Sequence, residues 1–334
     1  MRRALVAWLS VAGLLVACGL DESGLLSDSG APDVSVDAPK IDPPDAFADT
    51  PDDDALDAAA ADVFDLDAAQ AACEAACPSP ATCVAGTCTF DCSSDYSCQT
   101  AKITCPAGVP CDVRCTGTGA CTGPIDCTQA SRCDVACGPY ACTKTIGCGG
   151  SSCSIDCDQN ACGGDVTCNA SSCTLDCGRD AGASYACLGK TTCTGDHCSI
   201  LCAPDSCWQA VRCTATSSCD VDCDASYACQ QTVGCGGGPS CDVTCGDNAC
   251  TGDVTCDATG TCGVSCVGVY ACYGKVTSAA QTSTLCCDGP VSCAGAVSCG
   301  QTSCKAACLG AGSCVAGPPS CSAQTCDLDA STCP

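Results

Sequence analysis

The 334-residue sequence has few of the side chains that build enzyme active sites. It contains one histidine, His197, and only two glutamates, Glu22 and Glu74, so general acid–base chemistry would depend almost entirely on aspartate. We expect His197 in a turn, at the end of Thr194–His197, with no nucleophile and base arranged around it. No glycine-rich stretch is followed by the helix and lysine of a phosphate-binding loop. These absences favour a non-enzymatic protein without a cofactor.

Aromatic and basic residues are also scarce. Phe, Trp and Tyr make up 3% of the chain, which is too few for a conventional hydrophobic core. Twelve Lys and Arg stand against 38 Asp and Glu, for a formal net charge of −26. This charge repels the phosphate backbone, so we expect no nucleic acid among the partners.

Cysteine, in contrast, occurs 49 times. From Cys88 to Cys286 it follows the spacing C-x3-C-x4/5-C-x5-C, which restarts every 20 to 25 residues and gives nine units. A period of this length indicates a repeat architecture. The middle residue of each C-x3-C is apolar, as in Val113, and an apolar residue precedes the fourth cysteine by two positions, as in Ile146. Since alternate residues of a strand share one face, each unit is expected to contain two short strands with cysteine inside.

Turn residues separate these strands, as in 149–152 and 236–239, which are rich in Gly and Ser. Stacked units predict a mainly β fold, a flattened disulfide-laddered β-solenoid over residues 88–286. It resembles in kind the cysteine-laddered antifreeze solenoids of insects. A string of small independent disulfide knots is the alternative. Residues 287–334 have other cysteine spacings and are predicted as an irregular cap, although they could also extend the rod.

The cysteines are assigned to disulfides rather than to metal. Zinc sites usually combine C-x2-C or C-x4-C pairs with histidine, whereas here the close pair is C-x3-C and there is one histidine. The expected partners face each other across a turn, as do Cys137 and Cys142, and Cys148 and Cys153. Because a disulfide holds its Cα atoms about 5.5 Å apart, the interior should be thin and lack a deep pocket. Any function must then lie on the outside.

The N-terminus has the layout of a secretory signal, in which Arg2 and Arg3 precede a short apolar run and small residues. Leu15-Val16-Ala17-Cys18 then resembles the lipobox of bacterial lipoproteins. The resemblance implies that the signal, residues 1–17, is cut before Cys18 and that the Cys18 sulfur carries a lipid. Removing Cys18 leaves 48 cysteines, an even number that can pair completely. A plainly cleaved signal is the alternative.

An acidic segment rich in Asp, Pro and Ala, residues 18–50, is predicted to be a disordered tether. Thr50 and Pro51 then begin a predicted helix that reaches Cys77 within a cysteine-rich lead-in, residues 51–87. This helix would cover the first coil of the solenoid, since an open coil needs a cap. Continued disorder is the alternative.

Three features mark the predicted outer surface. The strands carry a broken column of carboxylates, which could attract Ca²⁺ but is better explained as a solvated face, at Asp91, Asp112, Asp134, Asp156, Asp176, Asp220, Asp222 and Asp242. Threonine is frequent on the second strand, as at Thr167, Thr192 and Thr255, but without the regular array of an ice-binding face. The residue two before each third cysteine alternates between aromatic and small: Tyr96, Gly119, Tyr140, Asn160, Tyr185, Asp205, Tyr227, Asn248 and Tyr270. Turn packing is enough to explain this alternation, and stacking of the five tyrosines on a polysaccharide or protein surface is the functional alternative.

Lipobox, Asp/Ala/Pro tether and cysteine repeats together resemble the cysteine-rich repeat lipoproteins of large-genome soil bacteria. The resemblance implies a protein anchored by lipid in the outer membrane or at the cell surface, with no specific activity. We therefore expect a structural or adhesive surface protein. An ion-binding or metal-sequestering extracytoplasmic protein is the alternative.

Overall fold

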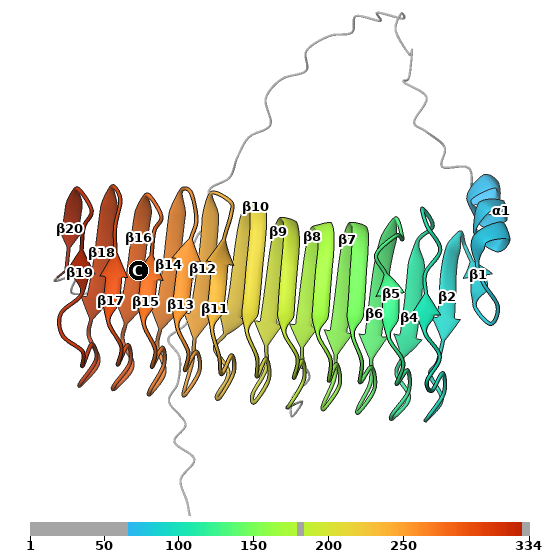
Figure 1. The fold of residues 1–334 in the computed structure, drawn as a ribbon, viewed down its shortest axis with the longest axis horizontal. Coiled ribbons are helices and arrows are strands. Elements are labelled where there is room, and N and C mark those ends of the chain that lie inside the picture. The colour runs from blue at the N-terminus through green and yellow to red at the C-terminus, as the bar shows by residue number, and fades with distance from the viewer. Residues whose placement is uncertain (1–65, 179–183, 329–334) are drawn as a thin grey trace, which may run out of the picture. The chain divides into compact units, whose positions relative to one another are not determined.

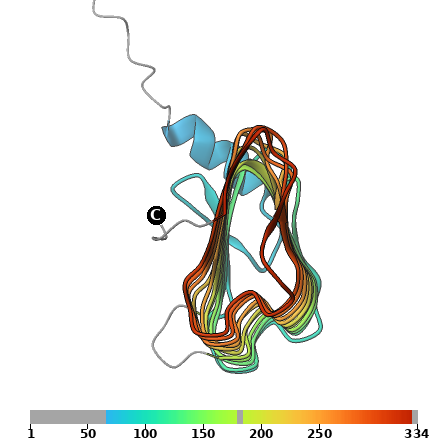
Figure 2. The ribbon, with the colours of Figure 1, turned by 90° about the vertical axis from the view of Figure 1, so that its left-hand side faces the viewer.

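A computed structural model describes residues 66–178 and 184–328 of the chain. They form one short helix and a β-solenoid of about 11 turns, in which each coil lies directly on the coil before it (Figure 1). The predicted fold class is thereby confirmed. Viewed along the stack, the coils project almost onto one another as a narrow, flattened ring (Figure 2).

Each coil contributes a strand to two rows. The first row carries the C-x3-C segments: β2 (Thr87–Asp91), β4 (Cys111–Cys115), β6 (Arg132–Cys137), β12 (Ser240–Cys245), β14 (Thr261–Cys266), β16 (Thr282–Cys287), β18 (Ser303–Cys308) and β20 (Thr325–Asp327). The second row consists of shorter strands: β3 (Ile103–Thr104), β5 (Ile125–Cys127), β11 (Val233–Gly236), β13 (Val254–Asp257), β15 (Val276–Ser278), β17 (Val297–Cys299) and β19 (Ser320–Cys321). In the middle coils one long strand serves both rows: β7 (Ile146–Cys157), β8 (Val166–Cys177), β9 (Thr191–Cys202) and β10 (Val211–Cys223).

These long strands correct one expectation. Residues 149–152 were expected to form a turn, yet they lie inside β7. Gly149 and Gly150 remain in ladder register with Asn169 and Ala170 of β8, so the chain rounds the corner without leaving the sheet. Gly150 makes this possible with a φ of 102°, a value that other residues rarely adopt. The second predicted turn, after Gly236, does separate β11 from β12.

Identical residue types stack because the coils pair in parallel and in register. Cys111 lies beside Cys133, and Val113 beside Val135. The inner positions are almost fully buried, and the interior is filled by cysteine, Val, Ile, Leu and Ala. The interior thus restricts the residue type at every second position of a strand, and the outward-facing positions between them can vary.

Disulfides close both edges of the flattened ring. At one edge each bond joins the second and third cysteines of a unit, as in Cys137–Cys142, and at the other it joins the fourth cysteine to the next unit, as in Cys148–Cys153. Both of these expected pairs are confirmed. Within the solenoid the Cα atoms of a bonded pair stand 5.7 to 6.2 Å apart, as a thin interior requires.

Complete pairing of the cysteines was expected, but Cys127 and Cys133 are free thiols. They occupy the register of the bonded pair Cys105–Cys111 in the preceding coil. The Cys127 sulfur lies 2.9 Å from the Cys105 sulfur, so it is directed along the stack. A hydrogen bond with Cys127 and burial raise the pKa of the Cys133 thiol, which keeps it protonated and unreactive at neutral pH.

The C-terminal segment extends the solenoid as far as it is described. Strands β16 to β20 continue the parallel ladder in register, which adds coils beyond the nine expected. The sequence pattern was lost because Ser278 and Ser283 stand where other coils have a disulfide, in register with Cys256 and Cys262. Their hydroxyl oxygens are buried and lie 2.7 Å apart.

The helix α1 (Leu66–Ala76) lies at the N-terminal end of the stack (Figure 1). Disulfides Cys73–Cys83 and Cys77–Cys88 join its end to β1 (Thr82–Val84) and β2, which pair as an antiparallel hairpin. The Gln70 side chain accepts a hydrogen bond from the backbone of the hairpin turn. This part of the predicted capping helix is confirmed, and residues 51–65 lie outside the described residues.

The serine pair makes the alignment of the coils testable. Replacing both residues, Ser278→Cys with Ser283→Cys, should create a further disulfide, because the pair lies between the bonded pairs Cys256–Cys262 and Cys299–Cys304. For so short a loop we expect a gain of about 2 kcal/mol in the free energy of unfolding. Mass spectrometry without reduction and thermal unfolding measure the two effects. Ser278→Cys alone is the control. Two alkylatable thiols in the denatured double variant beyond those of the wild type, which already has Cys127 and Cys133, would contradict the alignment.

Candidate functional site

The five tyrosines lie in the loops that follow the first-row strands. These loops form one edge of the solenoid, along the lower side of Figure 1. We call this row the tyrosine edge, defined as Tyr96, Tyr140, Tyr185, Tyr227 and Tyr270. Each tyrosine lies inside a loop closed by a disulfide, such as Cys137–Cys142 around Tyr140. The next coil in the stack carries Gly119, Asn160, Asp205 or Asn248 at the equivalent position, as the sequence predicted.

All nine equivalent positions have left-handed backbone conformations. The φ angles of the tyrosines lie between 58° and 62°, and those of the smaller residues are similar. Glycine, asparagine and aspartate tolerate this region, whereas a residue such as tyrosine pays about 1 to 2 kcal/mol for it. At these nine positions the costly residue occurs in every second coil, and the coil after Tyr270 adds Val291 with a φ of 58°.

Burial of the ring does not offset this cost. The side chains remain exposed, from 42% at Tyr185 to 65% at Tyr96. Strained backbone that is not repaid by packing is a reason to look for function. The tyrosine edge is thus the strongest candidate site in the described part of the chain.

The backbone beneath the rings is held in place. The amide of Tyr227 donates to the carbonyl of Asp247 in the next coil at 2.9 Å, and the amide of Asn248 donates to Val269 at 2.8 Å. This ladder runs along the edge from coil to coil. The ring of Tyr96 lies against Gly119, where an added Cβ would approach ring carbons at 3.0 to 3.1 Å. The Cδ1–Cε1 edge of that ring therefore lies beside the following coil, while the side chain stays largely exposed.

Two more aromatic residues lie close to this edge and were missed in the sequence. Trp208 and Tyr273 directly follow a third cysteine, and their side chains are 46% and 58% exposed. The Trp208 and Tyr185 rings have centroids 6.2 Å apart with an interplanar angle of 46°. In the sequence, their position directly after the third cysteine could have indicated that they lie at this edge. Only two coils have an aromatic residue at that position, so no repeating pattern pointed to them.

The outer face of the first row carries the carboxylates. In the described coils they stack only two deep, with Asp112 beside Asp134, Asp156 beside Asp176 and Asp220 beside Asp242. Arg114 forms an ion pair with Asp112, and Arg132 with Asp134. A continuous calcium ladder is therefore not formed, as the irregular sequence pattern indicated.

Asp220 lies close to two other carboxylates, Asp222 and Asp242, which repel its negative charge. Burial raises the pKa of Asp220, and the charges of Asp222 and Asp242 raise it further. Burial also raises the pKa of Asp222. Since the folded state binds these protons more tightly than the unfolded chain, their ionisation destabilises the fold as the pH rises above the ordinary value near 3.8.

Removing this charge should consequently stabilise the protein in a pH-dependent way. Asp220→Asn should raise the denaturant midpoint of the disulfide-intact protein at about pH 7 and lose that advantage near about pH 3, where the carboxyl is protonated. The matched control is Asp112→Asn, which breaks the ion pair with Arg114 and should bring no gain at neutral pH. Equal stabilisation at both pH values would contradict the repulsion.

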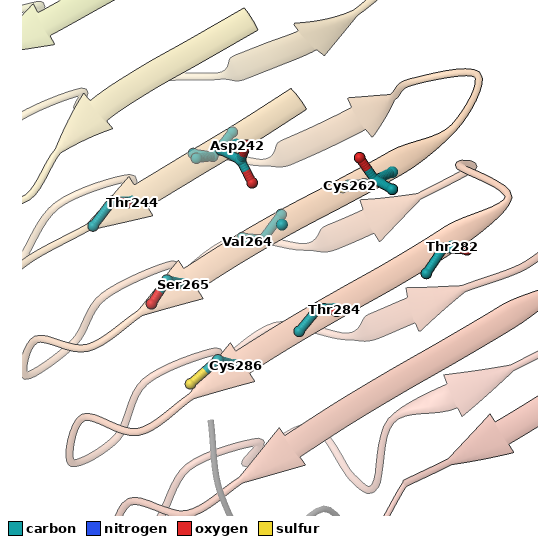
Figure 3. Close-up of a pocket in the computed structure, with 11 residues that line it drawn as sticks. Asp242, Thr244, Cys262, Val264, Ser265, Thr282, Thr284 and Cys286 are labelled. Atoms are coloured by element: carbon teal, nitrogen blue, oxygen red, sulfur yellow. The ribbon is translucent and has the colours of Figure 1, made fainter. Parts of the chain in front are cut away.

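A shallow hollow lies on the outer face of β12, β14 and β16 (Figure 3). It forms where Gly263 lacks a side chain, and the Asp242 carboxylate leans across the space that a Cβ would occupy. Hydroxyl groups of Thr244, Ser265 and Thr284 surround it. The hollow is open to solvent, in agreement with the expectation that surface features replace a deep pocket.

Cys286, at the rim of this hollow, explains the break in cysteine spacing. It takes an outward position between Ser265 and Ala307 in neighbouring strands, so Cys287 keeps the inner register and pairs with Cys293. Cys286 is nevertheless buried and disulfide-bonded.

His197 was expected in a turn but lies within strand β9. It is exposed, and its Nδ1 lies 2.9 Å from the Ser218 hydroxyl of the next coil, a neighbour that the sequence did not reveal. The contact lies on the open outer surface, where water would surround any reacting group. The threonines of the second row do not form an array either, because Arg212 and Gly234 interrupt the column between Thr192 and Thr255.

Several groups of three cysteine sulfurs lie close enough to suggest metal ligands, such as Cys157, Cys162 and Cys187. These sulfurs belong to neighbouring disulfides, whereas metal binding requires thiolates. The group of Cys105, Cys127 and Cys133 contains two thiols, both buried.

The proposed lipidation site, Cys18, lies outside the described residues. No helix in residues 66–178 and 184–328 is long and apolar enough to cross a membrane. No known protein family, curated protein or solved structure matches this chain.

Proposed function

We propose that this chain is a non-enzymatic surface lipoprotein whose rigid solenoid has a structural or adhesive function. Disulfides at both edges of nearly every described coil support the structural part of the proposal, since they restrict the chain where it turns. Exposed aromatic rings on a rigid support bind a partner at a low entropic cost. The single observation that carries the adhesive function is the row of exposed tyrosines in strained backbone.

The anchor rests on the sequence Leu15-Val16-Ala17-Cys18. A lipid on Cys18 would hold the rod at the outer membrane or cell surface, and the acidic tether, residues 18–50, would hold it away from the bilayer. A single acyl chain binds a membrane only weakly, so the several chains of a bacterial lipoprotein suit permanent display.

The anchor predicts a change in partitioning. The exported wild-type protein should enter the detergent phase, and Cys18→Ser should release or misprocess it, because the serine cannot carry the thioether-linked lipid. Detergent partitioning and the mass of the mature N-terminus measure this. Serine substitution of an internal thiol, Cys127→Ser, is the control for cysteine loss and should still partition into detergent. Equal membrane recovery of Cys18→Ser and wild type would contradict the proposed lipid anchor.

Adhesion through the tyrosine edge predicts a loss of binding without a loss of stability. Asparagine already occupies this position at Asn160 and Asn248, so Tyr140→Asn, Tyr185→Asn and Tyr227→Asn together should keep or raise the free energy of unfolding, by up to about 1 kcal/mol per site. Binding to polysaccharide or protein-coated surfaces should fall at least about tenfold. A pull-down on such surfaces, beside thermal unfolding, measures both.

The matched control replaces three polar side chains of the second row instead: Thr167→Asn, Thr192→Asn and Thr255→Asn. This triple variant should bind as the wild type does. If the tyrosine variant also binds like wild type, the tyrosine edge is turn packing and adhesion through it is excluded.

A further inference from the structure

The spacing along the tyrosine edge narrows the kind of partner that the proposed adhesion would serve. Tyrosine occurs in every second coil, and parallel strands stack about 4.8 Å apart, so neighbouring tyrosines stand about 9.6 Å apart. The coils shift only gradually along the stack (Figure 2), so the loops of this edge follow the length of the rod and do not wind around it. The edge therefore presents a linear series of rings at one interval.

The residue that follows a tyrosine in the next coil is small in most cases, which leaves room beside the exposed ring. The Tyr96 ring lies against Gly119, which has no side chain, and the Tyr140, Tyr227 and Tyr270 rings likewise precede coils with a small residue or valine at the equivalent position, Asn160, Asn248 and Val291. Aromatic faces stack on the C–H faces of pyranose rings, which are apolar and flat. The Asn160, Asp205 and Asn248 side chains between the rings are partly exposed and can hydrogen-bond to sugar hydroxyls.

Charge limits the polymer further. The net charge of −26 disfavours uronic acid, sulfate or phosphate polymers, and acidic side chains flank the edge at Asp95, Asp224 and Asp247. Apart from Trp208 beside Tyr185 and Tyr273 near Tyr270, the rings are spread along the rod, unlike the clustered apolar anchors that proteins use to bind one another. A neutral polysaccharide fits both observations better than a protein does.

An extended β-1,4-linked chain has the matching period. Successive pyranose rings of such a chain face opposite ways, so the same face returns with every second sugar, and two rings span close to the interval between neighbouring tyrosines. We propose that the tyrosine edge binds a neutral, extended β-1,4-linked polysaccharide parallel to the solenoid axis, with one tyrosine for every second sugar ring. This inference rests on the proposed adhesive function. It adds the chemical class of the ligand and the direction in which the ligand lies along the solenoid.

The test changes the spacing of the rings and keeps their number. The register variant combines Tyr140→Asn with Asn160→Tyr, and Tyr227→Asn with Asn248→Tyr. It keeps five tyrosines and two asparagines at positions that already accept both residues, but it places rings in adjacent coils. Microcrystalline cellulose and chitin are the probes, with insoluble α-linked glucan and an anionic uronic acid polymer as comparisons. Export level, disulfide content and thermal unfolding show whether the variant is folded.

We expect the wild-type protein to bind cellulose or chitin, and to bind soluble β-1,4 oligosaccharides more tightly with each added disaccharide. The register variant should bind them at least about tenfold more weakly. If the register variant binds as the wild type does while the triple Tyr→Asn variant does not, adhesion stands and the matched spacing is overturned. Equal or tighter wild-type binding to the α-linked glucan, the anionic polymer or a protein-coated surface overturns the ligand. Wild-type protein that binds neither cellulose nor chitin overturns it as well.

Discussion

The distance that a disulfide allows between two Cα atoms governs this molecule, because such bonds close almost every described coil at both edges. Within the solenoid that distance lies between 5.7 and 6.2 Å, far below the separation of about 10 Å between ordinary packed sheets. Cysteine and small or branched apolar side chains fill most of the interior, and Ile155 and Val221, for example, are almost completely buried. A ligand cannot enter such an interior, so recognition has to occur on the surface.

The same bonds make the surface rigid where they close short loops. A loop of five or six residues is ordered only modestly by its own disulfide, at about 2 kcal/mol, but each loop also hydrogen-bonds to the next coil, as Tyr227 does to Asp247. The conformation of the loop backbone is thereby restrained by three things: its own disulfide, the preceding coil and the following coil. Residues in this setting can adopt conformations that would be too costly elsewhere, and the left-handed tyrosines depend on it.

Inner and outer residues differ in how far the sequence predicts them. The interior imposes the same cysteine and apolar pattern on each coil, so strands, register and most disulfides follow from spacing alone. The cysteine pattern failed at two places. The buried, hydrogen-bonded Ser278–Ser283 pair replaces a disulfide, and Cys127 and Cys133 have the spacing of a bonded pair but remain free thiols. The tyrosine row was visible as spacing, but its backbone strain was not, because a tyrosine such as Tyr96 does not by itself indicate a left-handed φ near 60°. Trp208 and Tyr273 had no repeating neighbours to reveal them.

The two-coil period of the tyrosines cannot originate in the interior, which repeats with every coil. Nor does steric exclusion require it, since identical aromatic side chains stack at one-strand spacing in other parallel ladders. Tyrosines in consecutive coils would stack face to face and present their edges to the solvent. A glycine in the following coil instead leaves room for the Tyr96 ring, whose Cδ1–Cε1 edge reaches close to the space that a Cβ of Gly119 would occupy. Alternation thus keeps the tyrosine rings of neighbouring coils from covering one another, and uncovered ring faces are what stacking on a flat ligand requires.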